Sequence, residues 1–481
     1  MHNLEPKSVW RHFIALSQIP RPSGHEKSAA EYVISVAKER GLEWEQSEVG
    51  NVVIRVPAKP GHEKAPITVL QGHLDMVGEK NSNSFHNFLK DPLTLRLEGN
   101  VVKASGTTLG ADNGIGVAMS LALTEEQEAI HGPLELLFTV DEERGLNGAN
   151  GLTPGFIRGR RMINLDTEED GALYVGCAGG QDTVMTLRVG RSKAADERPV
   201  YRLSVTGLRG GHSGVDIHEG RGNANRYLVR TLQAMERRGV SFALVAVDGG
   251  SKRNAIAREA FATFHLDRAF LGAAKDAACE LQATGRLELK GVDDGLSISI
   301  EPGKAEFPPL APASQKKLVT FLAAIPHGYK AFSREIPGLV ETSTNFAIVT
   351  TKKATVEVCT SQRSSVMSQL AWAADWVASI GRLAGARIYQ SNGYPGWKPN
   401  LDSPLLKAAT ATFHRLHGHA PKHKAIHAGL ECGIIGDKFP GMDMVSLGPE
   451  IRNAHSPDEE VHVDSVQKTY KILIELLKDI A

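Results

Sequence analysis

Continuous apolar runs separated by helix-like segments are the feature of this sequence that most constrains its fold. The runs cover residues 67–72, 134–140 and 161–165, and they read "ITVLQG", "LELLFTV" and "RMINL". Successive apolar positions are typical of strands that are buried on both faces of a sheet. A helix-like segment, "GADNGIGVAMSLALT", separates the first run from the second. Strands that alternate with helices predict an α/β fold, with a mostly parallel mixed sheet flanked by helices.

The length of the chain, 481 residues, predicts two or three domains, because one ordinary core does not grow that large. From about residue 183, strand-like runs alternate with a period of two, which is typical of a sheet with one face open to water. Helix-like segments follow at about 222–238, 270–284, 313–325 and 365–382. We therefore predict a first domain formed by 1–182 and 386–481, interrupted by an inserted α+β domain over 183–385.

The charge balance argues against two classes of partner. Lys and Arg total 55, and Asp and Glu total 55, so the formal net charge is zero. This balance removes any bulk electrostatic reason to expect a nucleic acid or an anionic membrane as partner.

No apolar run approaches the roughly 20 residues that span a bilayer. The N-terminal segment carries charges inside its apolar stretch, so it predicts an amphipathic helix and not a signal peptide.

Cysteine usage indicates the compartment. The four cysteines lie far apart and show no paired spacing, which suits reduced thiols better than a disulfide framework or a Cys-based zinc site. We therefore expect a cytoplasmic protein. The four positions are Cys177, Cys279, Cys359 and Cys432.

Polar residues follow the predicted strands at the points where the strands end. His73 and Asp75 end the first run, and side chains two apart on an extended chain share one face. Further acids follow the other runs, and a last histidine follows the apolar "MDMVSL". The carboxyl ends of parallel strands face one crevice, so these side chains are expected to meet there. The residues concerned are Asp112 at a Gly-rich turn, Asp141, Glu142 and Glu143, Asp166, and His455.

The chemistry of this set favours a metal site. Carboxylates and imidazoles without thiolates suit Zn²⁺, Mn²⁺ or Co²⁺. Two histidines and three carboxylates could hold two ions if one carboxylate bridges them. Each residue alone has an ordinary explanation, because Asp112 could cap a helix and the other acids could be solvated loop residues. Spacing alone leaves these alternatives open.

Two function classes other than a metalloenzyme also remain open from the residues. The turn "LGADNGIG" resembles a Gly-rich nucleotide-binding turn, although the Asp inside it would repel a pyrophosphate. A non-catalytic metal-binding protein is the other class.

Seven motifs follow one another along the chain, in the order "GHLDMV", "GTTLGADNGIG", "DEERGLNGA", "LDTEEDG", "GGHSGVDIHEGRGNAN", "HAGLECG" and "SLGPEIRNAHSPDE". Together they resemble the M20 family of dinuclear metallopeptidases, and within it the bacterial dipeptidases. The resemblance covers essentially the whole chain, and it implies a two-zinc hydrolase with a catalytic domain and an inserted lid domain. It also implies that His73 and Asp166 hold one ion, that Glu143 and His455 hold the other, and that Asp112 bridges them.

The same resemblance implies two roles beside the ions. Glu142 would be the general base that accepts a proton from the attacking water. Asp75 would accept the other ring N–H of His73, which fixes the tautomer and raises the basicity of this ligand. His73 would then bind metal and Asp75 would hold His73.

The inserted domain is expected to contribute to substrate binding. The resemblance implies that His212 stabilises the oxyanion and that Arg363 and Asn345 clamp the terminal carboxylate of a dipeptide. Arg suits a carboxylate because its planar fork binds both oxygens. Gly429, in "HAGLECG", would belong to a substrate-binding turn. Without the resemblance, His212 would be explained equally well as a turn histidine bonded to backbone.

The implied activity is hydrolysis of dipeptides with a free C-terminal carboxylate, including those ending in histidine. The implied cofactors are two divalent ions, Zn²⁺ first, for which Co²⁺ or Mn²⁺ could substitute. An M20-type amidase or N-deacylase is the alternative, and a homodimer is left open. Two departures from the family pattern stand out: Asn453 and Ala454 precede His455 where Gly-Pro is common, and Arg144 follows the two glutamates.

Overall fold

The computed structural model describes residues 1, 3–193 and 196–481, which form two compact units. Unit 1 contains Met1–Cys177, Trp397–Ala425 and Leu430–Ala481, and unit 2 contains Ala178–Gly396 and Ile426–Gly429. The change of unit after Cys177 precedes β9 (Gly179–Arg188), whereas the sequence placed a boundary after residue 182, inside that strand. All ten residues of β9 pair with one strand of unit 2, so the strand is not divided.

Unit 1 is built on an eight-stranded mixed sheet with the order β1-β2-β6-β3-β7-β19-β8-β18. The four central strands pair in parallel, from β6 through β3 and β7 to β19, and β1, β2 and β8 pair antiparallel outside them. The predicted mixed sheet is thus confirmed, and its parallel pairings are confined to the centre. The strands are β1 (Glu43–Gln46), β2 (Val52–Val56), β3 (Thr68–His73), β6 (Leu134–Thr139), β7 (Arg161–Asn164), β8 (Ala172–Cys177), β18 (Lys422–Ile426) and β19 (Asp443–Ser446).

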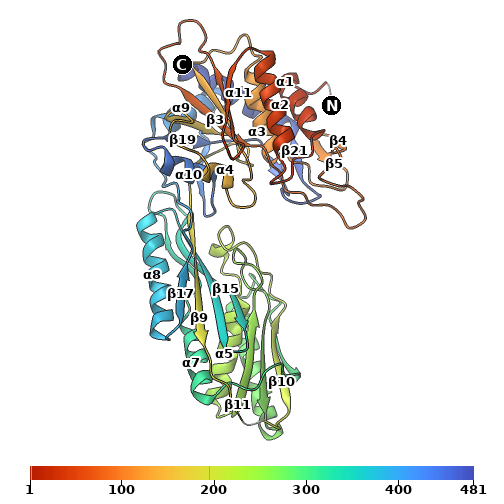
Figure 1. The fold of residues 1–481 in the computed structure, drawn as a ribbon, viewed down its shortest axis with the longest axis vertical. Coiled ribbons are helices and arrows are strands. Elements are labelled where there is room, and N and C mark those ends of the chain that lie inside the picture. The colour runs from red at the N-terminus through yellow and green to blue at the C-terminus, as the bar shows by residue number, and fades with distance from the viewer. Residues whose placement is uncertain (2, 194–195) are drawn as a thin grey trace. The chain divides into compact units, whose positions relative to one another are not determined.

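Helices cover this sheet, as the apolar runs require. Every residue of β3 and of β6 is buried, which explains why these strands are apolar at successive positions. α3 contacts both β3 and α1 (Figure 1). Almost all of its residues are buried. The helices are α1 (Lys7–Ser17), α2 (Lys27–Glu39), α3 (Ala111–Leu123), α4 (Asn147–Asn150), α9 (Pro404–His417), α10 (Glu431–Lys438) and α11 (Val463–Asp479).

A second, four-stranded sheet in unit 1 has the order β20-β21-β5-β4. Its strands are β4 (Leu95–Glu98), β5 (Val101–Ala104), β20 (Ile451–Arg452) and β21 (Glu460–His462). β20 and β21 pair antiparallel, and residues 453–459 connect them. This small sheet therefore holds both ends of the loop that carries His455.

Unit 2 is an α+β domain, as predicted from the period-two pattern. Its nine-stranded sheet has the order β13-β10-β12-β11-β15-β16-β9-β17, with β14 paired to β15, and its pairings are antiparallel. Besides β9, the strands are β10 (Val200–Thr206), β11 (Phe242–Gly249), β12 (Ala260–Leu266), β13 (Ser297–Pro302), β14 (Gly328–Phe332), β15 (Val340–Thr351), β16 (Thr355–Ser364) and β17 (Arg387–Gln390).

Four long helices pack on the sheet of unit 2. α8 lies along β9, β16 and β17, whereas α5 contacts β10, β12 and β15 (Figure 1). The apolar side chains of these helices and of the sheet form one core cluster. The helices are α5 (Ala224–Arg237), α6 (Leu271–Glu288), α7 (Pro312–Ala324) and α8 (Met367–Leu383), close to the four predicted segments. Across residues 1, 3–193 and 196–481, no helix combines the length and apolarity that a membrane span requires.

Candidate functional site

The carboxyl ends of the four parallel strands of unit 1 carry the predicted ligands. β3 ends at His73, β6 runs into the loop of Glu142 and Glu143, and β7 is followed by Asp166. β19 leads through residues 447–454, which include β20, to His455. Because these strands are parallel neighbours, their ends lie at the same edge of the sheet.

Asp112 reaches this edge from the start of α3. Its backbone is not helical, with φ −77° and ψ 111°, so the chain turns at this residue before the helix proper. Gly72 allows the close approach, since a Cβ there would lie 2.3 Å from Oδ1 of Asn113. The glycine in "GHLDMV" therefore lets the turn of Asp112 contact the last residues of β3.

Two groups of ligand atoms form around Asp112, one on each of its oxygens. His73 Nε2 lies 3.0 Å from Asp112 Oδ1 and 3.2 Å from Asp166 Oδ1. His455 Nε2 lies 3.0 Å from Asp112 Oδ2 and 2.9 Å from Glu143 Oε1. In each group, three atoms from three residues lie within 4.8 Å of one another. The five predicted ligands thus form two triads that share one carboxylate.

The triads fit divalent cations. Glu143 Oε1 and Asp166 Oδ1 are buried and accept no well-aligned hydrogen bond, although a histidine Nε2 atom lies beside each of them. Metal–ligand bonds of about 2.0–2.2 Å bring neighbouring ligand atoms to separations like those observed. Burial and neighbouring carboxylates raise the pKa of Glu143 and raise the pKa of Asp166 to about 6. A cation at each triad would offset this crowding of negative charge.

Asp75 contacts His73, as predicted, and also the acidic loop of Glu142 and Glu143, which the sequence did not predict. Its Oδ1 lies 3.4 Å from His73 Nδ1. Its two oxygens also accept the backbone N–H groups of Glu142 and Glu143, at 3.0 and 3.2 Å, and Ser23 Oγ donates at 2.7 Å. Burial alone would raise the pKa of Asp75, but His73 and these donors lower it to about 2. One buried carboxylate therefore holds both a ligand and the neighbouring acidic loop.

Glu142 occupies a tight turn directly after β6. Asp141 has a positive φ of 52°, and the N–H groups of Gly145 and Leu146 both donate to the carbonyl oxygen of Glu142. The turn allows two adjacent glutamates to face the same histidine, because Glu142, Glu143 and His73 also offer atoms within 4.8 Å of one another. Burial raises the pKa of Glu142 well above its usual range. The geometry is thus compatible with two roles for Glu142, as a ligand of a metal ion or as a residue beside the proposed ions.

Glu459 fixes the turn of Asp112 and was not predicted. This buried carboxylate accepts four consecutive backbone N–H groups, those of residues 109–112, at 2.8–3.3 Å. An anion at this Gly-rich turn is therefore supplied by the protein itself, which leaves these donors unavailable to a phosphate. These bonds argue against the nucleotide-binding alternative raised by "LGADNGIG".

Arg21 is a second buried anchor, and no motif in the sequence indicates it. Its guanidinium donates to the carbonyl oxygens of Leu74 and Asp75, both at 2.9 Å, and of Gly110 at 2.5 Å. The segment after β3 and the turn before α3 are thereby joined through one side chain. Glu459 and Arg21 contact residues far away in the chain, and no local sequence pattern identifies such partners.

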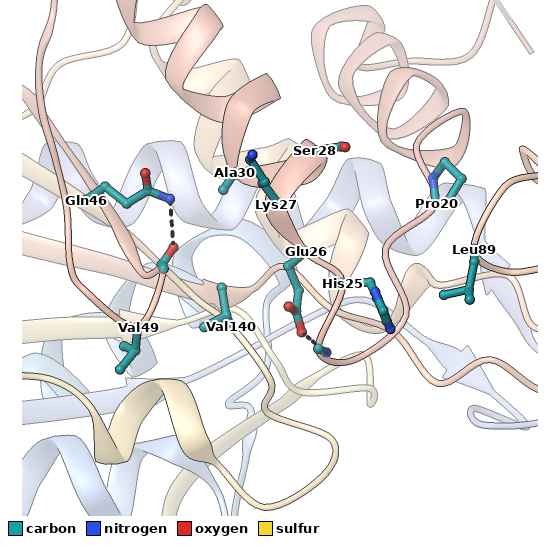
Figure 2. A pocket seen from close by; sticks show the side chains of 12 residues that line it. Pro20, His25, Glu26, Lys27, Ser28, Ala30, Gln46, Val49, Leu89 and Val140 are labelled. Atoms are coloured by element: carbon teal, nitrogen blue, oxygen red, sulfur yellow. Dashed lines mark hydrogen bonds between the residues drawn. The ribbon is translucent and has the colours of Figure 1, made fainter.

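A cavity of about 620 Å³ in unit 1 contains none of the predicted ligands. It is lined by the start of α2, the turn between β1 and β2, and Val140 (Figure 2). Glu26, in its wall, accepts the N–H groups of Gly24 and Asp141 at 2.5 and 3.1 Å. Glu26, Asp75 and Asp141 form a further acidic group, but Glu26 and Asp75 are bonded to backbone N–H groups and Asp141 to Arg144 and Asn147. Glu26 therefore helps to hold the acidic loop through Asp141, and none of the five predicted metal ligands lines this cavity.

His212, in unit 2, is held as a hydrogen-bond donor. Its Nδ1 accepts the N–H groups of Gly214 and Val215 at 3.3 and 3.0 Å, so the ring proton must be on Nε2. Burial and the nearby charge of Arg363 lower the pKa of His212 to about 4. The imidazole is therefore neutral near pH 7, with Nε2–H available to a negatively charged oxygen.

Arg363 is buried, with 7% of its surface exposed, and forms no ion pair with a carboxylate in the part of the chain described. Its Nη1 donates to the phenol oxygen of Tyr394 at 2.7 Å, and its buried Nε has no acceptor. Asn345 is also buried, but its amide donates to the carbonyl oxygens of Arg253 and Ala255. Arg363 thus retains donors for an anion, whereas the two donors of Asn345 are occupied.

Gly429 has a packing role in this structure. A Cβ at this position would lie 2.8 Å from Cε2 of Tyr394, so the glycine leaves space for that ring. The motif "HAGLECG" predicts a substrate-binding turn at Gly429, but it does not indicate a contact with Tyr394. A tyrosine beside the predicted Arg363 could be found only from the folded sheet.

Comparison with known proteins assigns the family. Residues 69–479 match the sequence model of peptidase family M20/M25/M40. The chain belongs to this family. It is 41% identical over 480 residues to the cytosol non-specific dipeptidase of Escherichia coli, an alignment that covers 100% of this chain and 99% of the relative.

Solved structures agree with this family membership. The chain resembles the crystal structure of aminoacylhistidine dipeptidase from Vibrio alginolyticus, with 40% identity and a TM-score of 0.90, over 99% of this chain and 97% of the other. A tripeptidase from Staphylococcus aureus has the same fold, with 15% identity and a TM-score of 0.58 over 99% of both chains. The predicted family and its fold with a lid domain are confirmed.

The four bonds made by Glu459 predict that this residue supports metal binding without being a ligand. Glu459→Ala should leave buried N–H groups unsatisfied, lower the free energy of unfolding by about 1–3 kcal/mol, and weaken divalent-metal affinity. Urea unfolding and metal titration measure the two effects. Glu460→Gln is the matched control, because the neighbouring Glu460 pairs with Lys103 instead. Unchanged metal affinity in Glu459→Ala would contradict this role.

Proposed function

We propose that the protein is a metal-dependent dipeptidase that hydrolyses dipeptides with a free C-terminal carboxylate. The observation that carries the proposal is the pair of ligand triads that share Asp112. It occurs in a chain that is 41% identical, over its full length, to a cytosol non-specific dipeptidase. Broad dipeptide specificity, including dipeptides ending in histidine, is part of the proposal.

The proposed ligand set follows the triads. His73 and Asp166 hold one divalent ion, His455 and Glu143 hold the other, and Asp112 contributes one oxygen to each. Zn²⁺ is the proposed metal, since imidazole and carboxylate ligands suit it, and Mn²⁺ or Co²⁺ would be accepted by the same ligands. When bound, two such ions would polarise the scissile carbonyl and lower the pKa of a water between them.

The residues beside the ligands then complete the reaction. Glu142 is proposed to accept the proton of the attacking water on its carboxylate and to transfer it to the leaving amine. Asp75 orients His73 and, through the N–H groups of residues 142 and 143, holds Glu142 at a fixed position. The support for this assignment is that Glu142 belongs to neither of the triads that share Asp112.

Unit 2 is proposed to bind the substrate. Arg363 would bind the C-terminal carboxylate, because it is a buried cation without an acidic partner in the described chain. His212 would donate its Nε2–H to the oxyanion, a bond that strengthens as the negative charge develops. Asn345 would act indirectly, since it donates to the carbonyl oxygen of Ala255, which forms an isolated β-bridge with His212. Gly429 would contribute through the space it leaves for Tyr394.

The cellular setting is proposed on the same basis. A cytoplasmic location agrees with the dipeptidase of Escherichia coli that is named for the cytosol. Small peptides are the proposed partners, and the zero net charge gives no reason to add a nucleic acid or a membrane.

Metal content should depend on the shared ligand. The wild-type chain should bind two divalent ions and lose activity on chelation, and added Zn²⁺, Mn²⁺ or Co²⁺ should restore it. Asp112→Asn should weaken both sites, whereas Asp166→Asn should leave about one ion per chain. Elemental analysis and metal titration measure this difference. Active wild-type protein that contains no divalent metal would refute the proposal.

Substitution of Glu142 should separate chemistry from metal binding. Glu142→Gln should keep two ions while kcat falls by roughly 10²–10⁴-fold, as expected for a lost general base. Glu143→Gln is the matched comparison, because loss of this adjacent ligand should reduce the metal content. If Glu142→Gln loses an ion, Glu142 is a ligand and the base lies elsewhere.

Removal of Arg363 should affect substrates with a free carboxylate most. Losing one partner of a buried charge pair costs about 2–5 kcal/mol, so Arg363→Ala should lower kcat/KM by roughly two orders of magnitude or more. The preference for dipeptides over their C-terminal amides should disappear with it. Arg188→Ala, at an exposed position on β9, is the control.

The substrate panel for this experiment should also contain tripeptides and N-acyl amino acids. Hydrolysis of N-acyl amino acids without hydrolysis of dipeptides would assign the protein to the amidases of the family. An Arg363→Ala variant that still prefers free carboxylates over amides would show that another residue binds this group.

A further inference from the structure

Arg363 and Tyr394 lie in one row across the sheet of unit 2. Arg363, on β16, pairs with Gly180 on β9, and Gly180 forms a β-bridge with Tyr394 on its other side. The backbones of Gly180 and Tyr394 are joined by two hydrogen bonds, of 3.0 and 2.9 Å. Residues directly opposite one another in antiparallel strands project to the same face. The side chains of Arg363 and Tyr394 therefore flank a position that has no side chain.

The missing side chain at Gly180 is what allows the two residues to meet. A Cβ at this position would lie 2.6 Å from both Cζ and the phenol oxygen of Tyr394, too close for the ring to keep its place. With glycine there, Arg363 Nη1 reaches the phenol oxygen at 2.7 Å. The contact thus passes directly over Gly180.

A second glycine, from a distant part of the chain, bounds the same ring. A Cβ at Gly429 would lie 2.8 Å from Cε2 of Tyr394. Gly429 belongs to the short segment Ile426–Gly429, which Ala178 anchors to unit 2 by donating to the carbonyl oxygens of residues 426 and 428. Two segments about 250 residues apart therefore leave space for one tyrosine ring, which indicates that close packing fixes the position of that ring.

The hydrogen bond from Arg363 to Tyr394 is important because the guanidinium of Arg363 is buried. A buried guanidinium is costly unless its N–H groups are bonded, and this one makes a single side-chain hydrogen bond within the described residues. The phenol oxygen accepts one N–H of the fork, so it fixes the direction of the guanidinium plane. The remaining donors are left for an anion.

We propose that Tyr394 is a positioning residue that orients Arg363 toward the terminal carboxylate of the substrate. Gly180 and Gly429 are, on this account, specificity-determining glycines, because they admit the ring that holds the arginine. The inference rests on the proposed function, in which Arg363 binds the carboxylate. It adds the residue that makes this arginine selective.

A double-mutant cycle tests the proposal. Tyr394→Phe keeps the ring and removes the phenol oxygen, so KM for a dipeptide should rise by roughly 10-fold, as for one lost hydrogen bond to a charged group. The change in kcat should be small, and hydrolysis of the matching C-terminal amide should be unaffected. In the Arg363→Ala background, Tyr394→Phe should cause no further loss. Gly429→Ala should displace the ring and act in the same direction as Tyr394→Phe.

The controls separate this inference from the proposed function. Tyr389→Phe, at a site that is 66% exposed on β17, should behave as wild type. A wild type without dipeptidase activity, or an Arg363→Ala variant with unchanged selectivity, would overturn the proposed function and this inference with it. If Arg363→Ala loses selectivity while Tyr394→Phe keeps the wild-type KM, only the inference fails. Equal losses on dipeptide and amide in Tyr394→Phe would show a merely structural role and would also overturn it.

Discussion

The shared carboxylate of Asp112 is the interaction on which the rest of this site depends. Each of its oxygens faces the Nε2 atom of a different histidine at 3.0 Å, and each of these nitrogen atoms also lies beside one further carboxylate. Such a concentration of buried negative charge is unfavourable unless cations offset it. Burial alone would raise the pKa of Asp112, yet His455 and His73 lower it. We therefore interpret the two triads as two cation sites that are coupled through the shared carboxylate of Asp112.

The scaffold meets this constraint with buried groups that bond to backbone. Glu459 holds the turn of Asp112 through four N–H groups, and Asp75 holds the loop of Glu142 and Glu143 through two. Arg21 joins the segment after β3 to the same turn. The positions of these segments are thereby fixed without using the oxygens of Asp112, Glu143 and Asp166, which remain available to the proposed ions. His455 lies in the connection between β20 and β21, where Asn453 and His455 have positive φ angles. Asn tolerates this conformation better than most residues, which explains how it replaces the common glycine.

Much of the fold could be predicted from the sequence because local patterns determine it. The apolar runs at 67–72 and 134–140 became β3 and β6, and the helix-like segment "GADNGIGVAMSLALT" between them became α3. The convergence of His73, Asp112, Glu143, Asp166 and His455 followed from parallel strand ends together with the family resemblance. Roles that depend on partners hundreds of residues away could not be predicted, as Glu459 and Tyr394 show. Asn345 illustrates the same limit, because its donors are occupied by a loop that the sequence does not place beside it.

Anomalous X-ray diffraction at the zinc absorption edge, on crystals of the Zn²⁺-loaded protein, tests the central claim most directly. The account predicts two peaks roughly 3.5–4 Å apart, as in other two-metal sites, with one Asp112 oxygen bound to each. One peak should be bound by His73 and Asp166, and the other by His455 and Glu143. A single peak, or two peaks without Asp112 between them, would contradict the account.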